Sequence, residues 1–332
     1  MTHPFQKELQ TALQAVREAA AVCRSVQSAI TTESLAKKDN SPVTVADYAS
    51  QAIVCRILQH NFPDDPVIGE EGAAELREPG GTEFLSHVVR ECAAVGVSAS
   101  PEEICNWIDR GGASEYSPRL WTLDPIDGTK GFLRKEQYAI SLALIMGGTI
   151  EIGVLGCPNM DVVGSPPGSG TLAWAVRGNG AWMQTFDQPD SVPQPIRVTS
   201  TDRASELRLC ESVESGHSSH DWSGLIASEL GIHTEPVRMD SQCKYLAVAR
   251  GDADVYLRLP THQGYQEKIW DHAGGVLVVL EAGGRVTDIH GREPEFFHGS
   301  TLSKNEGMAV SNGSVHHEIL AAILKHAPPG MV

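Results

Sequence analysis

Two aspartates three positions apart stand in a stretch suited to chemistry, Trp121-Thr122-Leu123-Asp124-Pro125-Ile126-Asp127-Gly128-Thr129. We expect a buried strand to end here in a turn that Pro125 stiffens and Gly128 bends. Carboxylates held close together repel one another unless a cation lies between them. Mg²⁺ prefers hard oxygen ligands, such as two carboxylates and the Ile126 carbonyl. The segment therefore predicts a magnesium site, although an Asx-turn with exposed acids would use the same residues.

Three other acids stand where an apolar segment ends or a helix begins. Glu70 follows the short apolar strand Val67-Ile68, and Asp271 opens an apolar helix. Asp47 also stands at the predicted start of a helix. Each has a simpler interpretation, because surface glutamates are common and aspartate is a frequent helix N-cap. None of the three predicts a site when taken alone.

Taken together, these segments resemble the inositol monophosphatase superfamily. The strings are Gly69-Glu70-Glu71, Asp124-Pro125-Ile126-Asp127-Gly128-Thr129 and Trp270-Asp271-His272-Ala273, in the order typical of that family. The resemblance implies a lithium-sensitive phosphatase that uses two or three Mg²⁺ ions. It implies metal ligation by Glu70, Asp124, the Ile126 carbonyl, Asp127 and Asp271. It further implies that Asp47 and Thr129 orient and deprotonate the water that attacks phosphorus.

Further strings are similar to the branch of this superfamily that hydrolyses 3′(2′),5′-bisphosphate nucleotides in fungi and plants. They include 39–48, 61–65, 128–139, 218–221, 240–245, 254–260 and 265–271. This likeness implies removal of the 3′-phosphate from 3′-phosphoadenosine 5′-phosphate, with 3′-phosphoadenosine 5′-phosphosulfate as a further candidate substrate. It implies substrate contacts from Thr129, His217, Ser241, Lys244 and Arg258.

Two of these assignments have open alternatives. His217 and His220 lie three apart in a Gly/Ser-rich segment, and either could serve, or both could be surface histidines. Arg258 could equally be a surface residue of a strand. Lys244 and Arg258 nevertheless supply the local positive charge that a second phosphate needs.

The overall charge limits the class of ligand. The 332 residues include 26 basic and 42 acidic ones, giving a formal net charge of −16. This balance argues against a broad nucleic-acid groove, because phosphate backbones require a basic face. A small anionic substrate remains compatible if metal ions offset the negative field. We expect a monomer without nucleic-acid or membrane partners.

Seven scattered cysteines without a CxxC pair argue against a zinc site. Their odd number, and an N-terminus that reads as an amphipathic helix, favour a reducing compartment. We expect the cytoplasm, with the nucleus or an organelle as alternatives. No run approaches the roughly 20 apolar residues of a membrane span.

The resemblance implies the layered α/β/α/β/α sandwich of this superfamily. An N-terminal α+β domain, 1–157, would carry most metal ligands, and a C-terminal α/β domain, 158–332, would add Asp271 and the nucleotide contacts. Residues 72–118 read as a surface insertion, and 164–170 as a flexible loop. Predicted helices are 4–30, 47–61, 83–95, 101–110, 221–231, 244–250 and 271–282, and predicted strands are 67–68, 120–123, 138–146, 149–155, 172–176, 181–183, 207–211 and 255–259.

Two other functions compete with the nucleotidase. A phosphatase for inositol phosphates, such as an inositol polyphosphate 1-phosphatase or an inositol monophosphatase, would use the same metal residues. A nucleotide sensor without turnover would require a damaged catalytic group. The acids and Thr129 are all present, so the pattern favours an enzyme.

Overall fold

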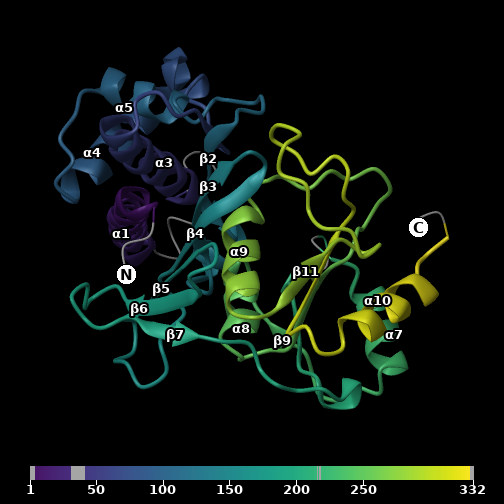
Figure 1. The fold of residues 1–332 in the computed structure, drawn as a ribbon. Coiled ribbons are helices and arrows are strands. Elements are labelled where there is room, and N and C mark those ends of the chain that lie inside the picture. The colour runs from purple at the N-terminus through teal and green to yellow at the C-terminus, as the bar shows by residue number, and fades with distance from the viewer. Residues whose placement is uncertain (1–3, 31–41, 215, 217, 330–332) are drawn as a thin grey trace.

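The fold is described from a computed structural model, which covers residues 4–30, 42–214, 216 and 218–329. Two sheets alternate with three layers of helices (Figure 1). The first sheet contains β1 (Val67–Gly69), β2 (Arg119–Asp127), β3 (Ala139–Met146), β4 (Thr149–Cys157), β5 (Thr171–Val176), β6 (Ala181–Thr185) and β7 (Gln194–Ile196), in that order. The second sheet has the order β11 (Arg285–Thr287), β12 (Met308–Ser311), β10 (Val255–Arg258), β8 (Leu209–Glu211) and β9 (Val237–Arg238).

The helices form the outer and middle layers. Helices α1 (Gln6–Ala29) and α3 (Pro42–Asn61) cover one face of the first sheet, and α8 (Cys243–Ala249) and α9 (Ala273–Glu281) lie between the two sheets. Helices α7 (His220–Glu229) and α10 (His316–Lys325) cover the second sheet on its far side. The remaining helices are α4 (Thr82–Ala94), α5 (Pro101–Asp109) and the short α6 (Thr129–Arg134). The predicted layered sandwich is confirmed.

The structure corrects several predicted elements. Helix α3 begins at Pro42, so Asp47 lies inside a helix rather than at its N-cap. Helix α9 begins at Ala273 with His272 as its N-cap, so Asp271 precedes it. Strand β2 continues through Asp127, where a turn was predicted. In α3 and β2, regular backbone hydrogen bonding extends through the segment in place of the predicted capping or turn conformation.

Residues 72–118 are more than a surface insertion. Helix α5 has a complete capping box, in which Ser100 and Glu103 bond each other's backbone N–H groups. Val88 of α4 and Ile104 of α5 are fully buried in the core formed with α1 and α3. The two helices therefore extend the first helical layer.

The segment predicted as a flexible loop, 164–170, is tied to Asp161. Its carboxylate accepts hydrogen bonds from the backbone N–H groups of Gly168 and Gly170, at 2.9 and 2.8 Å. Strands β5–β7 follow residue 157 and still extend the first sheet. The sheets thus do not separate at the predicted domain boundary, and the division into 1–157 and 158–332 stays a prediction.

All seven cysteines are free thiols in the interior. Burial raises the pKa of Cys55, Cys92 and Cys210 to about 12. These thiols remain protonated near neutral pH and are poor nucleophiles there. Within the described residues, no helix is both long and apolar enough to cross a membrane.

Candidate active site

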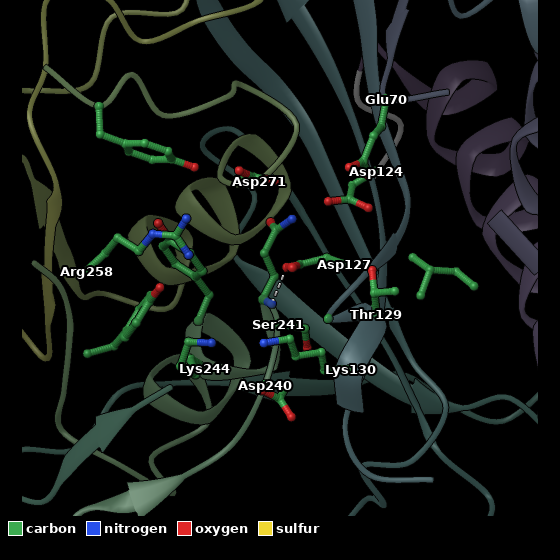
Figure 2. A pocket seen from close by; sticks show the side chains of 16 residues that line it. Glu70, Asp124, Asp127, Thr129, Lys130, Asp240, Ser241, Lys244, Arg258 and Asp271 are labelled. Carbon is green, nitrogen blue, oxygen red and sulfur yellow. Dashed lines mark hydrogen bonds between the residues drawn. The ribbon is translucent and has the colours of Figure 1, made fainter. Parts of the chain in front are cut away.

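The candidate site is a cavity of about 360 Å³ between the ends of β1 and β2 and the segment that leads into α8. Residues from both halves of the chain contribute to it (Figure 2). The lining residues are Glu70, Asp124, Ile126, Asp127, Gly128, Thr129, Lys130, Asp240, Ser241, Gln242, Lys244, Tyr245, Tyr256, Arg258, Tyr265 and Asp271.

Strand pairing brings three of the predicted acids together. Strands β1 and β2 are parallel, with Gly69 opposite Leu123, so Glu70 follows β1 beside Asp124. The pairing of β2 with β3 shifts register between Asp124 and Asp127. In a regular strand, residues three apart point to opposite faces, and a bulge changes this alternation. Both aspartates can therefore line one cavity, which period-two reasoning does not predict.

The acidic cluster is electrostatically unfavourable without a counter-charge. Burial, reinforced by Asp271, Glu71 and Asp127, raises the pKa of Glu70 to about 8. Burial and Asp127 raise the pKa of Asp271 to about 6, and burial with Glu70 raises that of Asp124 well above its usual range.

An unpaired oxygen in the cluster fits a metal ligand. Among the described residues, the buried Oδ1 of Asp124 has no hydrogen-bond partner. A cation that accepts hard oxygen ligands would satisfy this atom and relieve the repulsion among the neighbouring carboxylates. The donor set therefore fits a divalent metal, and the geometry describes a possible acidic metal site.

A close backbone contact joins the two halves at the cavity. The amide of Gln242 donates a hydrogen bond to Asp127, drawn as a dashed line in Figure 2. Gly128 has a φ of 88°, and a Cβ there would lie 2.8 Å from the Cβ of Ser241. Only glycine allows both this left-handed conformation and this approach. Helix α6, which begins at Thr129, is thereby held against the 240–242 segment.

Two basic side chains face the acids across the cavity, as Figure 2 shows. Lys244 is buried, which lowers its pKa, and its Nζ lies 5.2 Å from the ring centre of Tyr256. Arg258 stands at the end of β10 and pairs with Glu267. The cavity thus contains negative and positive regions, a pattern suited to a metal-bound phosphate with a second anionic group.

Most of the predicted site residues meet in this cavity, and Asp47 does not. Asp47 is buried within electrostatic range of Glu70 and Glu71, but it does not line the cavity. His217 lies outside the described residues. His220 lines a separate cavity of about 460 Å³, and its Nε2 lies 3.0 Å from the Ser212 carbonyl.

Sequence reasoning missed several lining residues. These are Lys130, Asp240, Gln242, Tyr245, Tyr256 and Tyr265. Each lies within a string that supported the family resemblance, so proximity to those strings was the available signal. Their residue types alone gave no signal, because residues such as tyrosine and glutamine are common in cores and on surfaces.

A second group of possible ligands adjoins the site. Atoms of Glu267, Asp271 and His272 lie within 4.8 Å of one another. Glu267 and His272 are already hydrogen-bonded to each other at 3.1 Å. Asp271 is therefore the member available to a metal shared with the main cavity.

Comparisons with known proteins agree with this arrangement. Residues 4–328 match the model of the inositol monophosphatase family. The chain is 40% identical to a Schizosaccharomyces pombe protein named 3′(2′),5′-bisphosphate nucleotidase, over 96% of this chain and 95% of that protein. It is 42% identical to an Oryza sativa protein of the same name, over 97% and 94%.

The fold also resembles solved structures at lower sequence identity. A Thermotoga maritima IMPase superposes with a TM-score of 0.63 at 19% identity, covering 97% of this chain and 98% of that one. An inositol monophosphatase from Anabaena gives 0.63 at 21% identity, with 98% of each chain covered. The match over nearly the whole chain, together with these relatives, places the protein in the inositol monophosphatase family.

Proposed function

We propose that this protein is a phosphatase that removes the 3′-phosphate from 3′-phosphoadenosine 5′-phosphate, yielding AMP and phosphate. The observation that carries the proposal is a single cavity lined by a cluster of carboxylates and by two basic residues, the buried Lys244 and the partly buried Arg258. The relatives named as bisphosphate nucleotidases support the choice of substrate. The proposal extends to 3′-phosphoadenosine 5′-phosphosulfate, which carries the same 3′-phosphate.

The carboxylates would hold the cofactor. We assign Glu70, Asp124, Asp127, Asp271 and the Ile126 carbonyl as ligands of two or three Mg²⁺ ions. When bound, such ions lower the pKa of a coordinated water, neutralise the phosphate and stabilise the leaving alkoxide. Lithium sensitivity, implied by the family resemblance, is part of the same proposal.

Two residues are proposed to prepare the attacking water. Thr129 lines the cavity at the start of α6, and Asp47 is buried within electrostatic range of Asp124 and Glu70. In this role Thr129 orients the water and Asp47 accepts its proton. Aligning the water for in-line attack supplies much of the rate enhancement in phosphoryl transfer.

The opposite side of the cavity would hold the nucleotide. Arg258 can contact the 5′-phosphate through its guanidinium, and Lys244 can contribute a point charge from the cavity wall. Ser241 offers a hydroxyl beside Lys244. His217 is retained as a proposed nucleotide contact. We further propose that the enzyme acts as a cytoplasmic monomer, which size-exclusion chromatography with light scattering and localisation of a tagged protein would test.

The direct test measures phosphate release from 3′-phosphoadenosine 5′-phosphate and from inositol 1,4-bisphosphate, with and without Mg²⁺ and Li⁺. We expect Mg²⁺-dependent release, a preference for the nucleotide, and inhibition by Li⁺. Asp124→Asn should abolish release, whereas Asp221→Asn, at an exposed position of helix α7, should retain it. A preference for inositol 1,4-bisphosphate would refute the assigned substrate, and nucleotide binding without phosphate release would indicate a sensor.

A further inference from the structure

Arg258 is held by a buried carboxylate that sequence analysis did not assign to any role. Its Nε donates to Oε1 of Glu267 at 3.1 Å, and its Nη2 lies 3.1 Å from Oε2. The Glu267 side chain is only 3% exposed and that of Arg258 16%. This two-point contact fixes the plane of the guanidinium as well as its position.

A second hydrogen-bonded chain fixes Glu267 in turn. His272 Nε2 lies 3.1 Å from Glu267 Oε2, and His272 Nδ1 lies 2.7 Å from the Tyr245 hydroxyl. An ionised carboxylate only accepts, so Nε2 carries a proton directed at Glu267. Although burial alone would raise it, Arg258 and His272 hold the pKa of Glu267 at about 2, so the group is an anion. Tyr245 and Arg258 both line the cavity, so both ends of this series of hydrogen bonds lie at the cavity wall.

Of the carboxylates that act on Arg258, Glu267 has the largest effect. Asp271, four residues further on, is another carboxylate whose charge acts on Arg258. Glu267 thus gives Arg258 a partner other than the proposed metal ligand Asp271.

We infer that Glu267 is a positioning residue for substrate recognition, which acts through Arg258 to hold the second phosphate of a bisphosphate. The inference rests on the proposed function. It assigns to Glu267 the selection of substrates that carry two phosphates over those that carry one. The hydrogen bonds that join Tyr245, His272 and Glu267 stabilise the same arrangement.

The test compares two substrates that differ in the second phosphate, 3′-phosphoadenosine 5′-phosphate and adenosine 3′-phosphate. For Glu267→Gln we expect the KM for the bisphosphate to rise about tenfold to a hundredfold, the usual effect of losing one charge-assisted hydrogen bond. The kcat at saturating substrate should change by less than about twofold, because the reacting groups are untouched. The KM for adenosine 3′-phosphate should stay close to that of the wild type.

A double-mutant cycle separates positioning from general structural support. If Glu267 acts through Arg258, the variant Arg258→Ala/Glu267→Ala should have the same KM for the bisphosphate as Arg258→Ala alone. Should Glu267→Ala fold poorly by circular dichroism, the same cycle is made with the nearly isosteric Glu267→Gln.

Asp254→Asn is the matched control. Asp254 is fully buried and pairs with Arg208 at 3.0 Å, and it does not line the cavity. This change should lower thermal stability without changing the ratio of the two KM values. An unchanged bisphosphate KM in Glu267→Gln, an equal loss for both substrates, or additive effects in the cycle would overturn the inference alone. A wild type that does not hydrolyse the bisphosphate would overturn the proposed function, and the inference with it.

Discussion

Helix α9 packs on the first sheet through two glycines, Gly274 of the helix and Gly153 of β4. This contact gives the sharpest stability prediction. A Cβ added to Gly153 of β4 would lie 2.6 Å from the carbonyl oxygen of Gly274, whereas ordinary contact begins at 3.4 Å. Gly153→Ala therefore requires a movement of about 0.8 Å between helix and sheet. Overpacking of this kind costs about 1–3 kcal/mol. For a chain of this length, that corresponds to a fall in Tm of about 1.5–4 °C.

The same displacement should affect the candidate site, because α9 begins two residues after Asp271. We expect Gly153→Ala to raise the Mg²⁺ concentration needed for half-maximal activity and to lower kcat/KM about tenfold to a hundredfold, as small misplacements of reacting groups do. The assays are a thermal melt and phosphate release titrated with Mg²⁺.

The matched control is the same substitution at an open position. Gly224 lies in helix α7, and a Cβ there meets no atom within 4 Å. Gly224→Ala should stabilise the protein by about 0.5–1 kcal/mol, because alanine loses less backbone entropy in a helix. If Gly153→Ala melts at the wild-type temperature and keeps its Mg²⁺ dependence, the close contact of α9 with the sheet does not position Asp271.

Three further predictions concern charge. Lys244→Met should lower kcat/KM for 3′-phosphoadenosine 5′-phosphate about tenfold to a hundredfold while sparing adenosine 3′-phosphate; an equal loss for both would contradict a role at the second phosphate. Mg²⁺ should raise the Tm by relieving carboxylate repulsion, and EDTA should reverse this rise. The variant Asp124→Asn should show no rise in Tm with Mg²⁺. A rise equal to that of the wild type would place the metal elsewhere. His316 is buried, with Thr287 Oγ1 2.9 Å from its Nε2 and Ser311 Oγ 2.8 Å from its Nδ1, and burial lowers its pKa to about 4. Because the folded state prefers neutral imidazole, the contribution of His316 to the free energy of unfolding is complete above pH 6.5. About 3 kcal/mol of that free energy is lost as the pH falls toward 4. Urea unfolding across that range should show a flatter pH dependence in His316→Gln than in the wild type.

The sequence predicted most elements of the first sheet because their signals are local. Strands β3 and β4 have long apolar runs around Gly147-Gly148, and α1 has a clear helical period. Elements after residue 284 were not predicted. Strands β11 and β12 have three and four residues, so their apolar runs are too short to specify a strand without their neighbours.

The candidate site was predictable where one segment carries the chemistry. Asp124 and Asp127 are close in the chain, and the resemblance supplied Glu70 and Asp271 to the same cluster. Contacts between distant residues were not predictable in this way. The Tyr245–His272 hydrogen bond joins positions 27 apart and depends on how α8 and α9 pack. Period-two alternation likewise could not reveal the register shift within β2.

The reactivity of the seven interior thiols can report local unfolding of this chain. A thiol reagent should label the native protein slowly, at a rate limited by how often each buried sulfur becomes exposed. Cys243 begins α8, two residues after Ser241, whereas Cys23 lies in α1. Labelling followed residue by residue would therefore distinguish opening near the cavity from opening of the outer helices. Substrate or metal that slows the reaction of Cys243 but not of Cys23 would show that ligands restrain the region around the cavity more than the outer helices.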